Sequence, residues 1–109
     1  MTLRTAFAPS LIERLQLAQD LAREDGKGKI FLEILEGCLR DIIVYQETGD
    51  EGRLLNRDLI DEIKQVADRR QKEKLLQSFW SVRKIRRGIE AHGNLQLALE
   101  SALVTMEGV

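Results

Sequence analysis

The chain has 109 residues, of which 43% are hydrophobic and 32% charged, and its formal net charge at pH 7 is −1. This length fits one domain with a modest core, and the near-neutral charge argues against a protein whose whole surface binds nucleic acid, while local basic patches stay open. The single cysteine, Cys38, excludes an internal disulfide and fits a reducing cytosol. The N-terminus lacks the apolar core of a signal peptide, and charged residues interrupt the longest apolar segment. We therefore expect a cytoplasmic protein without membrane contact.

The N-terminal part predicts a flexible arm over residues 1–8, followed by a single helical domain over 9–109. Ser10 and Glu13 have the spacing of a capping box, so Ser10 is the expected N-cap of a helix over about 11–25. Glycines at 26 and 28 end that helix, because glycine tolerates the left-handed conformation that closes a helix.

A second helix, over about 29–48, is the strongest candidate for burial. Gly37 lies in its middle, where glycine costs about 1 kcal/mol relative to alanine, so we expect a neighbouring helix to cross closely there. Two adjacent apolar columns at a spacing of four give this helix a wide apolar face: Ile30, Ile34, Cys38 and Ile42 in one, and Phe31, Leu35, Leu39 and Ile43 in the other.

A third helix is expected after Asn56, which is its predicted N-cap. Its apolar stripe includes Leu59 and Ile63, and a continuation of that stripe would bring Arg70 and Lys74 into the core. The chain is therefore predicted to break within about 68–73, between two separate helices.

The fourth helix is predicted over about 72–91, and Asn94 is the predicted N-cap of a fifth over about 95–107. The core face of the fourth helix is read from its spacing as Leu75, Phe79, Val82, Arg86 and Ile89. No segment alternates like a half-buried strand, so the predicted fold is all-α, a bundle-like arrangement of five helices.

The residues that carry enzyme chemistry are sparse. His92 is the single histidine and Cys38 the single thiol, which the pattern buries in an apolar column where thiols are inert. No carboxylates are spaced to complete a metal site with His92, and the short segment 26–29 lacks the upstream glycine of a phosphate-binding loop. We expect no catalytic residue, metal, cofactor or small-molecule ligand in this domain.

A basic segment spans residues 69–87, where Glu73 is the one opposing acid. It is read either as a nucleic-acid patch or as a solvated helix face whose first half complements the C-terminal end of the third helix. Trp80 alone is too little for a stacking platform, so direct DNA contact by this domain is the less favoured reading. The basic residues are Arg69, Arg70, Lys72, Lys74, Arg83, Lys84, Arg86 and Arg87.

Arg86 shares the predicted core face of the fourth helix, and a buried guanidinium needs a partner. Asp41 is the first candidate for a structural ion pair, because it falls on the apolar side of its own helix, and Glu100 is the second. An equally weighted alternative is that Arg86 reaches past the edge of the core to solvent.

Leu76 and Trp80 lie one turn apart and roughly 100° or more from the core face of the fourth helix. Either the third or fifth helix covers them, or they are buried against another chain. Arg83 and Arg87 flank the same side, and tryptophan and arginine are enriched at interface hot spots. We favour a partner interface made of these four residues.

Several motifs, taken in order over residues 30–104, resemble the C-terminal domain of the bacterial DNA polymerase III delta-prime subunit, a clamp-loader protein. The related gamma/tau subunits have a similar domain and are the alternative within that family. The motifs are Leu39-Arg40-Asp41-Ile42-Ile43, Asn56-Arg57-Asp58-Leu59, Ile85-Arg86-Arg87-Gly88-Ile89-Glu90 and Asn94-Leu95-Gln96-Leu97-Ala98-Leu99-Glu100.

The resemblance implies an all-helical collar domain without catalysis of its own, at the C-terminal end of a longer subunit. In that family, the collar domains of five subunits pack side by side in a ring. Their N-terminal AAA+-like modules open the sliding clamp in an ATP-driven step and place it on primed DNA for the DNA polymerase III holoenzyme. The implied partners are the delta and gamma/tau subunits. Rival readings are a small helical nucleic-acid-binding module and a free-standing helical adaptor or homodimer.

Overall fold

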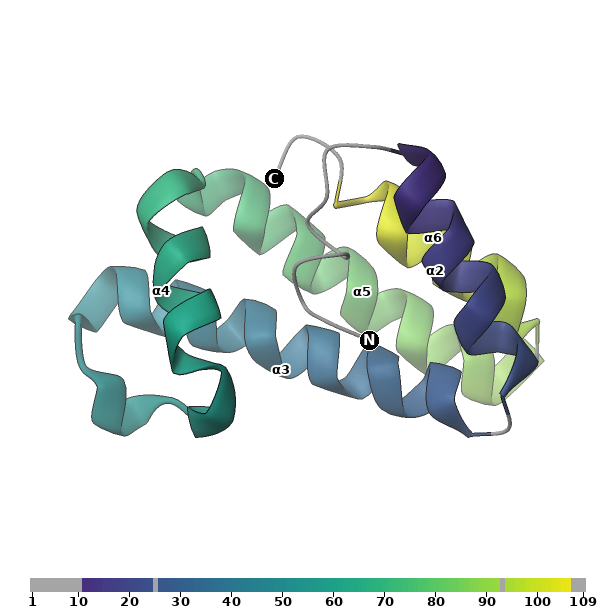
Figure 1. Cartoon of the computed structure of the whole chain (residues 1–109), viewed down its shortest axis with the longest axis horizontal. Coiled ribbons are helices and arrows are strands. Elements are labelled where there is room, and N and C mark those ends of the chain that lie inside the picture. The colour runs from purple at the N-terminus through teal and green to yellow at the C-terminus, as the bar shows by residue number, and fades with distance from the viewer. Residues whose placement is uncertain (1–10, 25, 93, 107–109) are drawn as a thin grey trace.

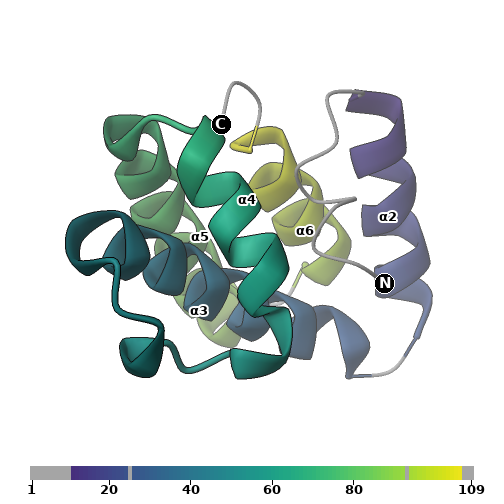
Figure 2. The ribbon, with the colours of Figure 1, turned by 60° about the vertical axis from the view of Figure 1, so that its left-hand side comes forward.

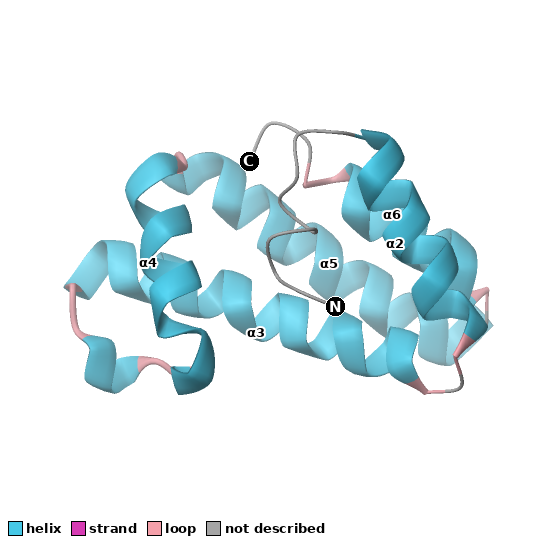
Figure 3. Cartoon of the chain, in the orientation of Figure 1, coloured by secondary structure: helices cyan, strands magenta, loops and turns pink. Residues whose placement is uncertain are grey.

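A computed structural model describes residues 11–24, 26–92 and 94–106 (Figure 1). Over these residues the chain forms helices joined by turns and no strand, which confirms the predicted all-α class (Figure 3). The elements, in chain order, are α2 (Leu11–Arg23), α3 (Lys27–Thr48), the 3-10 turns η1 (Glu51–Arg53) and η2 (Arg57–Leu59), α4 (Ile60–Arg69), α5 (Lys72–His92) and α6 (Leu95–Val104). The predicted arm at 1–8 and the predicted N-cap Ser10 lie outside the described residues.

The two longest helices, α3 and α5, run side by side in opposite directions (Figure 1). α4 packs across one end of α3, while α2 and α6 pack on each other near its other end (Figures 1 and 2). α3 therefore contacts every other helix, as its wide apolar face predicted. None of the helices in the described ranges is long and apolar enough to cross a membrane.

The buried stripe of α3 differs in one respect from the two predicted columns. Leu32 is completely buried, whereas Ile30 in the first turn is 55% exposed. The helix buries a single stripe at spacings of three and four rather than both full columns. The buried apolar residues of α3 are Phe31, Leu32, Leu35, Cys38, Leu39 and Ile42.

A neighbouring helix approaches α3 closely at Gly28. The prediction that this close crossing lies at Gly37 is wrong. A Cβ atom on Gly28 would lie 2.9 Å from Leu95 Cδ2 and 3.0 Å from Leu99 Cδ1, so α6 approaches the start of α3 closely. A Cβ on Gly37 would instead meet the side-chain nitrogen of Asn56 at 3.2 Å. The space beside Gly37 is therefore filled by a loop residue and not by a helix.

The predicted break between the third and fourth helices is confirmed at Arg70, which is extended with φ −113° and ψ 148°. Gln46 of α3 stabilises this break, because its Nε2 donates to the carbonyl oxygens of Ala67 at 3.0 Å and Arg70 at 2.8 Å. Carbonyls at a helix end lack partners within the helix. The side chain of Gln46 thus ties the end of α4 to α3.

Of the two remaining predicted caps, one is confirmed. The side-chain oxygen of Asn94 accepts a hydrogen bond from the Leu97 backbone N–H at 3.1 Å, the geometry of an N-cap. The prediction for Asn56 is wrong, because its side chain caps no helix and the chain continues through a 3-10 turn before α4 begins. The Asn56 amide instead donates to Asp41 of α3.

Candidate protein–protein interface

The outer face of α5 is the strongest candidate site. We define it as Leu76, Trp80, Arg83, Lys84 and Arg87, which recur along the helix at spacings of three and four and so share one side. The opposite side holds the completely or almost completely buried Leu75, Ser78 and Val82. Ser78 also donates from Oγ to the Thr105 carbonyl at 3.1 Å, which fixes α5 to the end of α6.

Trp80 is 59% exposed, so neither α4 nor α6 covers it. Its ring meets the Phe79 ring edge to face, with centroids 5.2 Å apart and an interplanar angle of 75°. The guanidinium carbon of Arg83 lies 5.6 Å from the Trp80 ring centroid, within the range of a cation–π contact. These two contacts hold the indole in place while most of its surface faces solvent.

The rest of the outer face surrounds Trp80 with apolar and cationic groups. Leu76 is half-buried one turn before the tryptophan, so the chain covers Leu76 in part and leaves Trp80 mostly exposed. Lys84 and Arg87 are exposed, and Arg83 is half-buried. A large exposed aromatic side chain beside arginines has the composition of a protein–protein hot spot.

The predicted ion pair between Arg86 and Asp41 does not form. Arg86 pairs with Glu36 at 3.0 Å, and both side chains lie half-buried between α3 and α5. Because α3 and α5 run in opposite directions, the late position of Arg86 in α5 lies level with an earlier part of α3 than Asp41. Glu36 therefore takes the place predicted for Asp41 or Glu100, and Arg86 does not escape to solvent unpaired.

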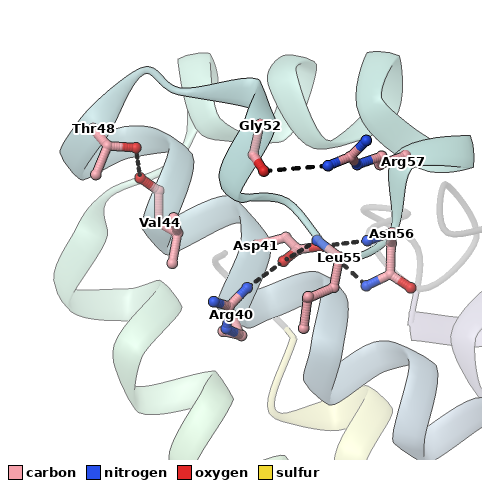
Figure 4. A network of polar contacts seen from close by, with 8 residues as sticks. All are labelled: Arg40, Asp41, Val44, Thr48, Gly52, Leu55, Asn56 and Arg57. Atoms are coloured by element: carbon pink, nitrogen blue, oxygen red, sulfur yellow. Dashed lines mark hydrogen bonds and ion pairs between the residues drawn. The ribbon is translucent and has the colours of Figure 1, made fainter.

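Asp41 instead anchors the segment that follows η1 (Figure 4). Its carboxylate is completely buried and accepts from the backbone N–H groups of Leu55, at 3.2 Å, and Asn56, at 2.8 Å. It also accepts from Asn56 Nδ2 at 3.0 Å and from Arg40 at 2.7 Å. A buried carboxylate is tolerated where such donors and a cation satisfy it.

This Asp41 network joins two of the family-like motifs, 39–43 and 56–59, in space. Leu54, which directly precedes the anchored residues, is itself buried. Sequence reasoning missed this role, although an aspartate inside an apolar helical stripe was a signal that some donor had to reach it. The network is structural, since its carboxylate faces the chain's own amides and leaves no open position for a ligand.

Cys38 has the properties of a core residue. Burial raises the pKa of its thiol to about 12, with smaller contributions from the carboxylates of Asp41, Asp58 and Glu62. A thiol with so high a pKa has almost no thiolate near neutral pH and is a poor nucleophile. His92 ends α5, and its side chain lies outside the described part. Within the described residues, no group of three or more histidine, cysteine, aspartate or glutamate side chains is placed to hold a metal.

A comparison with known families gives one match that spans nearly the whole chain. The family model described as "DNA polymerase III, delta subunit, C terminal" matches residues 2–108. Neither a curated protein nor a solved structure matches the chain.

Proposed function

The chain belongs to the family formed by the C-terminal domains of DNA polymerase III delta subunits, and we propose that it is the collar domain of a delta-prime subunit of the clamp loader. The matching family model is described by the delta subunit. Among the clamp-loader subunits, the four ordered motifs between residues 39 and 100 support delta-prime, and the collar domain of a gamma/tau subunit is the alternative. Residues 9–109 would form one helical unit at the end of a longer cytoplasmic polypeptide. Its work is assembly with delta and gamma/tau subunits, and the assembled loader carries out the ATP-driven placement of the sliding clamp on primed DNA.

The observation that carries this proposal is the exposed Trp80 on the outer face of α5. The chain itself leaves the indole 59% exposed although Arg83 and Phe79 already fix its position. A side chain held in its bound geometry loses little entropy when a partner covers it. The outer face of α5 is therefore the surface that we expect a neighbouring subunit to bury.

The test replaces Trp80 with glutamate in the full-length protein and measures its assembly with gamma/tau and delta by light scattering after gel filtration. Hot-spot tryptophans contribute about 2 kcal/mol or more, so we expect the affinity to fall by about 30-fold or more. Leu97→Glu is the matched control, because Leu97 on α6 is also 59% exposed. The far-UV helix signal should stay unchanged in both variants. Normal assembly of the Trp80→Glu protein would contradict the proposal.

Nucleic-acid binding by the basic segment 69–87 is a second candidate function, favoured by its exposed cations. Contacts to phosphates make affinity fall steeply with salt. Anisotropy of labelled single-stranded and duplex DNA, titrated at low and moderate salt, should show saturable and salt-dependent binding if this function is real. Weak binding without saturation would rule out nucleic-acid binding as a function of this segment.

A further inference from the structure

The positive charge on α5 is unevenly neutralised. Lys72 at its start pairs with Glu47 of α3, and Arg86 pairs with Glu36. By contrast, Arg83, Lys84 and Arg87 take part in none of the ion pairs formed between described residues. Among the described residues, Lys72 and Arg86 on the side of α5 that faces α3 are thus paired with acids, and the three cations on its outer face are not.

Arg83 is the best-positioned of these cations. Its guanidinium carbon lies 5.6 Å from the centroid of the Trp80 ring, and its Nε is shielded from solvent with no hydrogen-bond acceptor among the described residues. Arg83 is half-buried as a whole, so a partner meets its terminal N–H groups and not the shielded Nε, and the planar fork of a guanidinium fits a carboxylate. The structure therefore holds this cation in place, and no acidic side chain among the described residues pairs with it.

The charge pattern also limits which kind of molecule can bind the outer face of α5. A second copy of this chain, docked face to face through a two-fold axis, would bring Arg83, Lys84 and Arg87 against their own equivalents, because such an interface is built from the same patch on both sides. Duplex DNA supplies anions but no apolar side chain for the exposed Trp80 and half-buried Leu76, and a single tryptophan is too little for a stacking platform for single-stranded bases. A polypeptide with both carboxylate and apolar side chains matches both features.

Building on the proposed function, we infer that the outer face of α5 receives an acidic segment of a neighbouring clamp-loader subunit. An apolar side chain of that segment packs on Trp80, and carboxylates beside it pair with Arg83 and Arg87. Opposite charges set the register and speed association, whereas the buried aromatic contact supplies most of the affinity. Assembly through this face is accordingly sensitive to salt.

The experiment removes the charges and keeps the aromatic group. The full-length protein with Arg83→Gln and Arg87→Gln is titrated with gamma/tau and with delta at 50, 150 and 500 mM NaCl, and affinity is followed by calorimetry. Lys29→Gln with Arg23→Gln is the charge-matched control, because both residues are exposed, lie on other helices and fall outside the basic segment 69–87. We expect at least a tenfold loss of affinity at 50 mM salt and a flatter salt dependence for the first pair, with changes under twofold for the control.

The outcomes separate this inference from the proposed function. If Trp80→Glu weakens assembly but Arg83→Gln with Arg87→Gln changes neither affinity nor salt dependence, the face is an interface whose partner is not acidic, and only the inference fails. If neither set of substitutions matters, both fail. Loss of DNA affinity with intact assembly would assign the cations to nucleic acid, and a dimer of the isolated protein that the double variant abolishes would assign them to a second copy. Either result would overturn the inference.

Discussion

Substitution of Asp41 by asparagine tests whether one buried carboxylate holds the loop between α3 and α4. The carboxylate accepts three separate donors from Leu55 and Asn56, besides the Arg40 guanidinium. A hydrogen bond to a charged group contributes about 1.5–3 kcal/mol. Asparagine has the same shape but only one acceptor oxygen, and its NH₂ group would face N–H donors. We expect a loss of about 2–4 kcal/mol, within the usual range for breaking a buried polar network.

Urea denaturation followed by circular dichroism at 222 nm measures this loss, because most of the described residues are helical. At about 5 °C per kcal/mol, the thermal midpoint should fall by about 10–20 °C. Asp68→Asn is the control, since Asp68 is an exposed aspartate of α4 and surface substitutions usually stay within about 0.5 kcal/mol. Equal or higher stability of the Asp41→Asn protein would refute the reasoning, because it would mean that desolvation of the charge outweighs its hydrogen bonds.

Two further predictions concern the core and the glycines. Since folding raises the pKa of the Cys38 thiol from 9.0 to about 12, the unfolded chain loses this proton first, and the stability linked to it is present below about pH 9 and lost as pH rises toward 12. Comparison of alkaline unfolding between wild type and Cys38→Ala should show the smaller pH dependence in the variant, and equal slopes would count against burial of the thiol. Gly88→Ala should stabilise the isolated chain by about 0.5–1 kcal/mol, because Gly88 lies inside α5 and a methyl group there would have nothing within 4 Å. Gly49→Ala should destabilise it, because Gly49 has φ +63°; thermal melts that reverse this order would contradict the assignment.

Helical periodicity predicted where the helices lie in the sequence but not how two packed helices are aligned along their axes. It located the break at Arg70, because the alternative would have buried charged side chains. It failed for Arg86, because a helical wheel gives the direction of a side chain around the axis and no information on its level along a neighbouring helix. Glu36 and Asp41 both lie on α3, and only the antiparallel alignment with α5 selects Glu36.

The type of a residue likewise indicated what interaction it can make but not which residue it contacts. Asn56 was predicted to be the N-cap of the third helix, but its side chain caps no helix and its amide donates to the buried Asp41. Gly37 was predicted to lie at a close helix crossing, but a loop residue lies beside it and α6 approaches Gly28 instead. Trp80 was singled out because it departs from the core face, and its exposure agrees with that pattern. The identity of a covering subunit is not encoded in one chain, since its complementary groups belong to another sequence.

The way α4 is attached to α3 has a consequence for motion. Ile63 is the one residue of this ten-residue helix that is buried, and Ile60, Val66 and Ala67 pack against the core only partly buried, so α4 buries less apolar surface than α3. Two side chains of α3 also hold the two ends of α4. Asp41 accepts from the backbone of Asn56, shortly before α4, and Gln46 donates to carbonyl groups at the end of α4. A segment that buries less apolar surface than its neighbours opens at a lower free energy, and often as a unit. Amide hydrogens of α4 should therefore exchange together and well before those of α3. In this local opening α4 would separate from α3 while the other helices stay packed.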